Sequence, residues 1–166
     1  MLKDYFEMRK MRQLFGRYLP DDTVEKILNE GQSGSGKMKP AKIEFVFILL
    51  RDDVSAEDLS KQVGIATTLC LDFEATVSDI CGPLVIAVFN FPRLVPEASE
   101  KRLILARKIR AELGERVKLV HGSAQAQTGN FGADPRCTFS FTFPGFGKAL
   151  ATLTQLDFGE ISEFKP

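Results

Sequence analysis

The side chains in this sequence that could carry out nucleophilic catalysis are few. His121 is the only histidine, so a Ser-His-Asp or Cys-His scheme would have to use it. It lies at the predicted end of a strand and is followed by Gly122 and Ser123. We interpret it as a structural histidine that is exposed or half-buried, and we predict no catalytic role for it.

Carboxylates occur close together at two places, Asp52 with Asp53 and Asp72 with Glu74. General acid–base chemistry requires a partner acid or base within hydrogen-bond reach of such a group. The sequence provides no evident partner for either pair. We therefore predict that both pairs lie in solvated loops.

The three cysteines, Cys70, Cys81 and Cys137, are an odd number and have no CxxC spacing. No cluster of histidine and cysteine is present that could bind zinc. We predict that the cysteines are reduced and buried, which fits a cytosolic compartment. The sequence therefore predicts no metal centre of this type.

Two glycine-rich stretches could in principle hold an anion. Gly31 and Gly36-Lys37 have the spacing of a phosphate-binding loop, but Met38 replaces the required Ser or Thr, and a helix end precedes the stretch instead of a strand. Residues 144–147 (PGFG) precede a predicted helix whose first N–H groups could contact an anion. We interpret the first stretch as a linker and the second as a turn.

The composition indicates one globular domain without affinity for nucleic acid or membranes. The chain has 166 residues, of which 44% are apolar, and 22 basic residues balance 22 acidic ones. No overall field therefore draws it to nucleic acid or anionic lipid. Apolar runs such as residues 45–50 are far shorter than the roughly 20 residues of a membrane helix. We expect no secretion signal, and a membrane segment in a longer parent protein stays open.

The N-terminal part is predicted to be helical and separate from the main domain. Residues 1–14 carry apolar side chains at three- and four-residue spacings, which predicts an amphipathic helix. This helix either packs on its own domain or ends a parallel coiled coil. After a second short helix at 23–29, we assign residues 1–30 to a helical signalling or dimerisation segment, 31–40 to a flexible linker and 41–166 to one domain.

Alternating strand and helix patterns predict an α+β fold for the main domain. A β-hairpin with Gly82-Pro83 at its tip lies at the centre of the expected sheet. In chain order we predict a strand at 42–50, a helix from a Ser55–Asp58 cap to about Cys70, hairpin strands at 75–80 and 85–92, a helix from Pro96-Glu97 to Leu113, a strand at 117–128, a turn at 129–132, a strand at 137–143, a helix at 148–156 and an edge strand within 158–164. This order implies a ferredoxin-like, mostly antiparallel sheet with helices on one face.

The helix that ends at Leu113 has the clearest amphipathic pattern, and Gly114 stops it. Its inward face is predicted to hold Leu103, Leu105, Ala106, Ile109 and Leu113. Its basic residues are predicted to face water: Lys101, Arg102, Arg107, Lys108 and Arg110. A solvated face is the better interpretation of this basic stripe in a chain of zero net charge.

Four stretches, in this order, resemble the class III adenylyl and guanylyl cyclases. Residues 14–28 (LFGRYLPDDTVEKIL) look like the segment before the catalytic domain in many bacterial members. Residues 82–92 (GPLVIAVFNFP) are similar to the central hairpin, residues 129–132 (GNFG) to the turn before the fifth strand, and residues 140–151 (SFTFPGFGKALA) to the strand and helix that close the active site. The resemblance covers residues 14 to about 156 and implies a cyclase-homology fold.

The sequence departs from this family at the metal site. Family members hold two divalent metals with two aspartates, one ending the first strand and one at the hairpin tip, and these positions fall on Leu49 and Pro83. Neither side chain offers an oxygen ligand. Asp52 and Asp53 follow a few residues later, and only a register change could bring Asp52 back.

The other family residues are mostly lost as well. The base-reading lysine falls on Asp79, and the transition-state asparagine and arginine fall on Ala149 and Leu153 or, after a shift by one, on Lys148 and Thr152. At Thr142, where some members place a base-contacting threonine, the family residue is kept. The segment between the first strand and the hairpin is also shorter than in the family.

The resemblance thus implies a degenerate cyclase domain that acts by association. Phosphoryl transfer depends on metals and cationic groups to offset developing charge, and these positions cannot supply it. We predict a regulatory or scaffolding module in the cytoplasm, without catalytic residues, metal or cofactor, as a homodimer or as a heterodimer with another cyclase-type domain. The hairpin and the phenylalanine-rich strand are expected to form the interface. Two alternatives stay open, an active adenylate or guanylate cyclase and a domain that senses a nucleotide.

Overall fold

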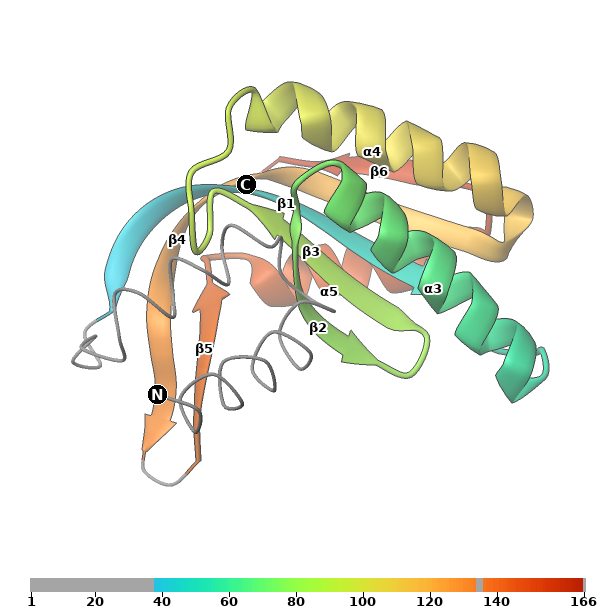
Figure 1. Cartoon of the computed structure of the whole chain (residues 1–166), viewed down its shortest axis with the longest axis horizontal. Coiled ribbons are helices and arrows are strands. Elements are labelled where there is room, and N and C mark those ends of the chain that lie inside the picture. Colours follow the sequence, from blue (N-terminus) through green and yellow to red (C-terminus); the bar gives the residue numbers. More distant parts are fainter. Residues whose placement is uncertain (1–37, 134–135, 166) are drawn as a thin grey trace, which may run out of the picture.

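The computed structural model describes residues 38–133 and 136–165. The elements follow in the order β1 (Lys39–Leu50), α3 (Ala56–Asp72), β2 (Thr76–Cys81), β3 (Leu84–Phe89), α4 (Ala98–Leu113), the 3₁₀ turn η1 (Gly114–Arg116), β4 (Val117–Ala133), β5 (Arg136–Thr142), α5 (Phe146–Gln155) and β6 (Ile161–Phe164) (Figure 1). Lys39 and Pro40, assigned to the linker from the sequence, are part of β1. The predictions for residues 1–37, including the N-terminal helices and the Gly31–Lys37 stretch, lie outside the described residues.

The strands form one sheet with the order β2-β3-β1-β4-β5, and β6 also pairs with β4. Neighbouring strands are antiparallel, except that β6 runs parallel to β4. From β1 to β4 the chain has the βαββαβ connectivity of a ferredoxin-like unit, in which β3 and β1 occupy the centre. The predicted α+β, ferredoxin-like fold is confirmed.

Local sequence determines where the helices begin and end. Ser55 precedes α3, and its hydroxyl accepts a hydrogen bond from the N–H of Asp58 at 3.1 Å, as predicted. α4 ends where Gly114 adopts a φ of 60°. Gly145, with a φ of 89°, precedes α5, so the predicted turn is confirmed for Pro144 and Gly145, whereas residues 146–147 already belong to α5, which begins two residues earlier than predicted.

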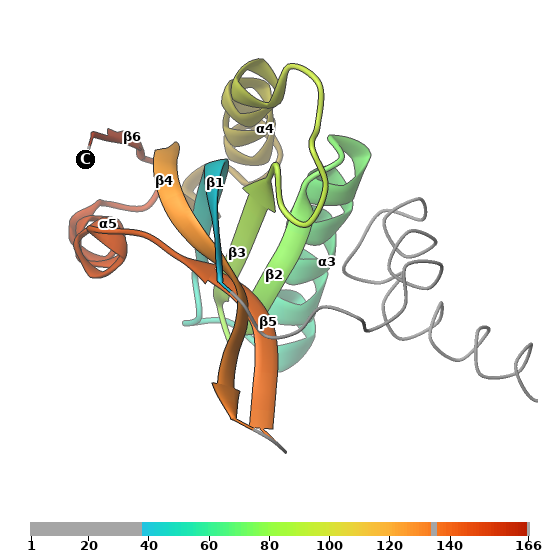
Figure 2. The same cartoon turned by 90° about the vertical axis from the view of Figure 1, so that its left-hand side faces the viewer.

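β4 is longer than predicted, because residues 129–132 do not turn the chain. They continue the strand, and Gly129 and Gly132 pair with Ser140 and Cys137 on β5. The predicted turn at this place is therefore wrong. Gly129 has a φ of 148°, a backbone conformation that favours glycine. This residue therefore allows an irregularity within the strand and does not form a turn. As a result, β4 and β5 extend as a two-stranded arm beyond the rest of the sheet (Figures 1 and 2).

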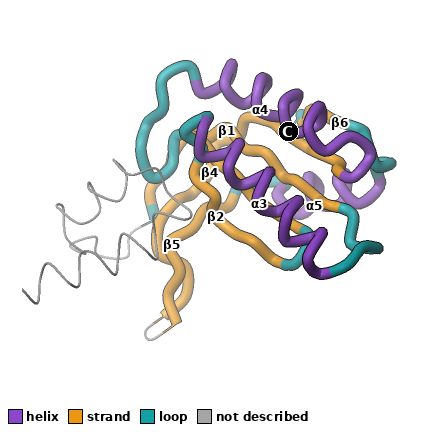
Figure 3. Tube along the Cα trace, turned by 45° about the vertical axis from the view of Figure 1, so that its right-hand side comes forward, coloured by secondary structure: helices purple, strands orange, loops and turns teal. Residues whose placement is uncertain are grey.

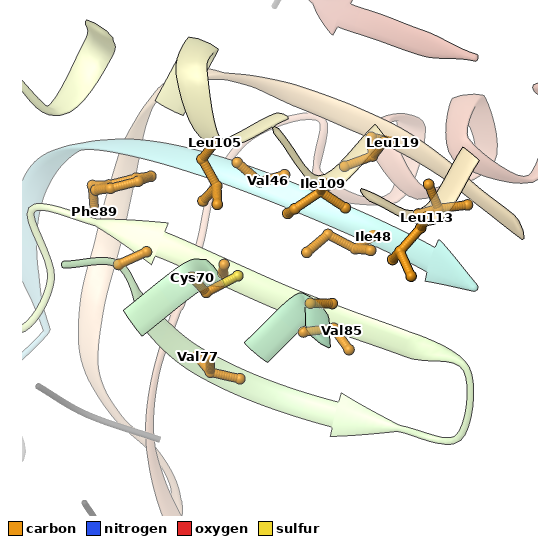
Figure 4. Packing of buried hydrophobic residues seen from close by; sticks show 14 of the residues in the cluster. Val46, Ile48, Cys70, Val77, Val85, Phe89, Leu105, Ile109, Leu113 and Leu119 are labelled. Atoms are coloured by element: carbon orange, nitrogen blue, oxygen red, sulfur yellow. The ribbon is translucent and has the colours of Figure 1, made fainter. Parts of the chain in front are cut away.

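Helices cover both faces of the sheet (Figure 2). On one face, which we call the α3/α4 face, helix residues such as Leu105 and Ile109 pack on Val46 of β1 (Figure 4). α5 lies on the opposite face, so the prediction of helices on one face is right for α3 and α4 and wrong for α5. The reason lies in β1, where six consecutive residues, 43–48, are buried and both faces need a cover.

The face under α5 is built largely from phenylalanines, and we call it the aromatic face. Phe45 of β1 stacks on Phe143 with ring centroids 4.8 Å apart. Gly122 of β4 makes room for this packing, because a Cβ there would lie 3.1 Å from the Phe45 ring and 2.9 Å from the carbonyl oxygen of Phe164. Phe141 and Phe143 are both buried, which confirms the inward side of the predicted alternation in this strand.

Candidate functional site

The two positions that the resemblance assigns to metal-binding aspartates lie next to each other. Leu49 on β1 pairs with Leu84 on β3. The carbonyl oxygen of Pro83 accepts a hydrogen bond from the N–H of Leu50 at 2.9 Å. The end of β1 and the hairpin tip therefore form one place, which we call the hairpin site and define as Leu49, Pro83 and Leu84.

The hairpin site is apolar. Leu49 and Leu84 are half-buried and pack against the aromatic face. Phe47, two residues before Leu49 on the same side of β1, is fully buried, and its ring centroid lies 5.1 Å from that of Phe146 on α5. The site is thus continuous with the hydrophobic core of this face.

The donor groups at the hairpin site do not fit a pair of divalent metals. Such metals require several oxygen ligands, and the three side chains of the site have none. Asp52 and Asp53 are exposed beyond the end of β1, where Asp53 pairs with Arg51 at 3.5 Å. The register of β1 against both neighbours is unbroken, so no slip carries Asp52 back. Within residues 38–133 and 136–165, no three His, Cys, Asp or Glu side chains cluster in a way that could hold a metal.

A buried cation, Lys118 on β4, lies directly opposite Leu49 in the ladder. Its ammonium donates to the carbonyl oxygens of Thr154 at 2.9 Å and Leu156 at 2.8 Å. It also lies 4.9 Å from the centroid of the Phe158 ring. Because carbonyls at a helix C-terminus carry partial negative charge, this contact holds the end of α5 against the sheet. The charge of Lys118 is therefore committed to the helix.

α5 directs two of the expected catalytic positions into the core. Ala149 and Leu153 are fully buried beneath the helix, where a substrate does not reach them. The alternative alignment is nearer the surface: Lys148 is exposed and Thr152 half-buried, with the Thr152 hydroxyl donating to the Lys148 carbonyl at 3.0 Å. Thr142 is exposed at the end of β5.

Asp79 is exposed on β2, the strand at the edge of the sheet. It pairs with Ile86 directly after an irregularity at which the register shifts. Paired residues share a face, so Asp79 lies on the aromatic face beside the hairpin site. Cys81, at the end of the same strand, is exposed, so its predicted burial is wrong.

The α3/α4 face contains a buried ion pair that we did not predict. Arg102 of α4 lies 3.1 Å from Glu44 of β1, and both side chains are only 5% exposed. Arg102 also donates to Glu163 of β6 at 3.0 Å, and the hydroxyl of Ser123 donates to Glu44 at 2.6 Å. The prediction that Arg102 faces water is wrong, because a carboxylate inside a buried strand requires a cationic partner. Arg110, predicted to face water as well, is half-buried.

His121 lies beside this ion pair and is buried, in contrast to the predicted exposed or half-buried position. It pairs with Glu163 in the β4–β6 ladder, and its Nδ1 has no hydrogen-bond partner among the described residues. Burial lowers its pKa, and the positive charge of Arg102 lowers it further. The neighbouring Ser123 hydroxyl is engaged by Glu44, so these groups do not form a nucleophilic pair.

The remaining candidate groups make structural contacts. Glu74 binds Lys101 and, at 3.2 Å, Arg93, and these hydrogen bonds lower the pKa of its carboxyl group. Glu74 lies in the predicted loop, but its carboxylate is paired and only partly exposed, whereas Asp72 is exposed as expected but is the last residue of α3 and not part of a loop. Cys70 is buried, and burial raises the pKa of its thiol to about 12, which makes it a poor nucleophile.

Glu44 and Lys118 organise the packing, yet we singled out neither from the sequence. A cue was present for both, since each is a charged residue within a short apolar strand pattern. A charge in such a position must be paired or neutralised. The sequence does not show which distant element provides the partner.

Comparison with known proteins finds similarity in structure without similarity in sequence. No known family description matches the chain, and no curated protein matches it. The adenylyl cyclase CyaB from P. aeruginosa is 16% identical with a TM-score of 0.59, over 75% of this chain and 77% of that chain. The guanylate cyclase domain of RhGC from Catenaria anguillulae, solved in complex with GTP, is 15% identical with a TM-score of 0.63, over 74% and 78%.

A third structure is the guanylyl cyclase domain of the RhoGC fusion protein from Blastocladiella emersonii, described as a non-canonical dimer. It is 15% identical with a TM-score of 0.61, over 74% of this chain and 79% of that chain. None of the helices in the described ranges is long and apolar enough to cross a membrane. At sequence identities this low, the similarity concerns the fold alone. This chain therefore has the fold of adenylyl and guanylyl cyclase catalytic domains.

Proposed function

We propose that this chain is a catalytically degenerate nucleotide-cyclase-like domain that acts as a regulatory or scaffolding module by associating with a second cyclase-type domain. The observation that supports this most is the hairpin site. The fold brings the end of β1 and the hairpin tip together, and the residues that stand there are Leu49, Pro83 and Leu84, none of which has a side-chain oxygen.

The physical argument concerns charge. Transfer of a phosphoryl group builds negative charge that metals and cationic side chains must offset. The hairpin site offers no oxygen ligand, and its buried neighbour Lys118 is bound to helix carbonyls. Asp79 adds a negative charge on the same face. Each of these features weakens the case for nucleotide cyclisation by this chain alone.

The dimer interface that we expected from the sequence is retained only in part. Phe141 and Phe143 are buried in the aromatic face of their own chain, so they are not available to a partner. The half-buried Leu49 and Leu84 remain, and we propose that they contact the partner through the hairpin. A dimeric arrangement of a structurally similar guanylyl cyclase domain is consistent with this proposal. A signalling role for residues 1–30 is part of the proposal as well.

The decisive experiment is a cyclase assay on the purified chain with ATP or GTP and Mn²⁺ or Mg²⁺. We expect no cyclic nucleotide above a protein-free control. Formation of cAMP or cGMP, abolished by substitution of a single residue in this chain, would overturn the proposal in favour of an active cyclase. Calorimetry with ATP and GTP then tests the nucleotide-sensing alternative, because saturable binding without product would support a sensor.

Association is tested by size-exclusion chromatography with light scattering. We expect a dimer for the natural chain, and Leu84→Asp should shift it toward monomer because a charge replaces a half-buried apolar contact. Leu94→Asp is the matched control, because Leu94 is 81% exposed in the loop at the other end of β3. A monomer at all concentrations, alone and with a catalytically competent cyclase domain, would contradict the association model.

A further inference from the structure

A pocket of about 360 Å³ opens between α3 and the turn η1 that follows α4, and none of the hairpin-site residues lines it. It is lined by Val54, Asp58, Lys61, Gln62, Ile65 and Arg116. α3 and α4 diverge toward the end of the molecule where α3 begins and α4 ends (Figures 1 and 3). Four of the lining residues recur at helical spacing on α3, so one side of that helix forms a wall.

Gln62 is the unusual residue of this pocket. It is only 3% exposed, and its Oε1 is buried without a hydrogen-bond partner in the described part of the chain. A buried amide oxygen without a hydrogen-bond partner destabilises the fold, so its presence here needs a reason. Rotation of the last side-chain torsion exchanges the amide oxygen and nitrogen, so Gln62 can offer an occupant either an acceptor or a donor.

The charged groups of the pocket favour an anion. The Nε of Arg116 donates to the Leu113 carbonyl at 3.1 Å, and among the described residues its two terminal nitrogens have no partner. Lys61 pairs at 2.9 Å with Glu57 and at 3.9 Å with Asp58, whose carboxylate also accepts a hydrogen bond from Ser55 at 2.8 Å. Lys61 is therefore already paired with two carboxylates, and the guanidinium end of Arg116 is the cationic group of the lining that is available to an anion.

The lining of the pocket also has an apolar part that could contact a ligand. Val54 and Ile65 both line the pocket, and Ile65 is 40% exposed, so both can contact a hydrophobic body. We propose that this pocket binds a small organic anion: a carboxylate or phosphate held by Arg116, with an apolar or aromatic body between Val54 and Ile65 and a polar group hydrogen-bonded to Gln62.

The pocket is connected to the sheet by the backbone of Arg116. Its carbonyl oxygen accepts a hydrogen bond from the N–H of Arg51 at 2.8 Å, directly after the end of β1. This inference does not depend on whether the chain has cyclase activity, since it uses none of the hairpin-site residues.

The test is an NMR titration of the full ¹⁵N-labelled chain with benzoate, phenyl phosphate and inorganic phosphate. We expect benzoate or phenyl phosphate to shift the amide signals of Lys61, Gln62 and Arg116 saturably, with inorganic phosphate binding at least about fivefold more weakly because it lacks the apolar body. Equal affinity for inorganic phosphate and phenyl phosphate, or no localised shifts at millimolar concentrations of either organic anion, would overturn the proposal.

Three variants sharpen this test. Arg116→Gln should weaken binding of the organic anion about tenfold, because a charge-assisted hydrogen bond is lost. Gln62→Leu should weaken binding about fivefold while leaving the melting temperature unchanged or higher, since an unpaired buried amide is replaced by an apolar side chain of similar size. Lys108→Gln, an exposed change on α4 outside the lining, should have no effect. Unchanged binding in Arg116→Gln would refute the assignment even if Gln62→Leu failed to fold.

Discussion

The two faces of the sheet are covered by different kinds of side chain, although the same strands form both. The α3/α4 face encloses the charges of Glu44 and Arg102 and the imidazole of His121 among aliphatic side chains. The aromatic face is filled by phenylalanine rings, and the ammonium of its buried Lys118 is hydrogen-bonded to carbonyls at the end of α5.

This difference shows where ionic chemistry has been kept and where it is missing. In the cyclase-like resemblance, the aromatic face is the side on which metals and phosphates would be bound. Here the core of that face is apolar and its charged groups near the hairpin site, Lys118 and Asp79, do not pair with each other, whereas paired carboxylate and guanidinium groups lie on the other face, where they join α4 to β1 and β6. The ionic groups of the core thus contribute to architecture.

The largest effect is expected from placing the family's arginine on the aromatic face. Leu153→Arg buries a charge without a partner and should cost several kcal/mol, roughly 4 or more, so that little folded protein remains. Circular dichroism and urea unfolding measure this. Thr152→Arg is the matched control on the same turn of α5: Thr152 is half-buried and near the surface, so we expect a change below about 1 kcal/mol. Equal stability of the two variants would refute the assignment of Leu153 to the core.

The next effect concerns the ion pair of the α3/α4 face. Arg102→Met leaves Glu44 buried without its partner and should reduce the free energy of unfolding by about 3–5 kcal/mol. Adding Glu44→Leu should restore most of this loss, because an apolar pair replaces the charged one. Urea unfolding of the two variants decides the matter. A single variant that loses less than the double variant would show that the pair is not buried as described.

A smaller change in stability, but a gain of binding, is expected at the hairpin site. The double variant Leu49→Asp with Pro83→Asp should lose about 1–3 kcal/mol and acquire a Mn²⁺ site that the natural chain lacks. Calorimetry with MnCl₂ measures the gain. Leu49→Asn with Pro83→Asn is the control, since it has similar size and polarity without charge. Failure of the aspartate variant to bind Mn²⁺ better than this control would mean that the two positions do not face a common point.

The smallest effect is a pH dependence from the α3/α4 face. The pKa of His121 is lowered from its ordinary value of 6.5, mainly by burial and then by Arg102, while Glu163 opposes the shift and Arg107 adds to it. The unfolded state therefore binds more protons below pH 6.5, and stability falls as the pH drops below that value. His121→Gln should reduce this fall, as urea unfolding above and below pH 6.5 would show. The lowered pKa of Glu74 affects stability at more acidic pH, below the ordinary carboxyl pKa of 4.5.

Much of the fold was accessible from the sequence because it depends on local rules. The Ser55 cap, the stop at Gly114 and the hairpin around Gly82-Pro83 are set by residues within a few positions of one another. The turn predicted at 129–132 failed because the glycines there serve a long strand whose pairing with β5 is a tertiary contact. The position of α5 was missed for the same reason, since the identical apolar stripe could have packed on either face.

The candidate site was predictable in part. The sequence identified Leu49 and Pro83 as the informative positions, and the fold brings them together. It could not show that Ala149 and Leu153 are core residues or that Arg102 is buried, because both depend on contacts between distant elements. The pocket at Gln62 was invisible for a further reason: a single glutamine on an amphipathic helix has no distinguishing pattern.

The attachment of α5 by Lys118 has a consequence for recognition. The ammonium of this lysine joins the last carbonyls of the helix, and the ring of Phe158 is flanked by it and by Arg51, whose guanidinium carbon lies 4.5 Å from the ring centroid. A molecule that docks at this end of the sheet would therefore meet a surface whose shape is already fixed. Little conformational entropy would then be lost on binding. Selectivity there would come from shape fitted in advance, and a poorly matching surface would gain nothing from rearrangement of the helix.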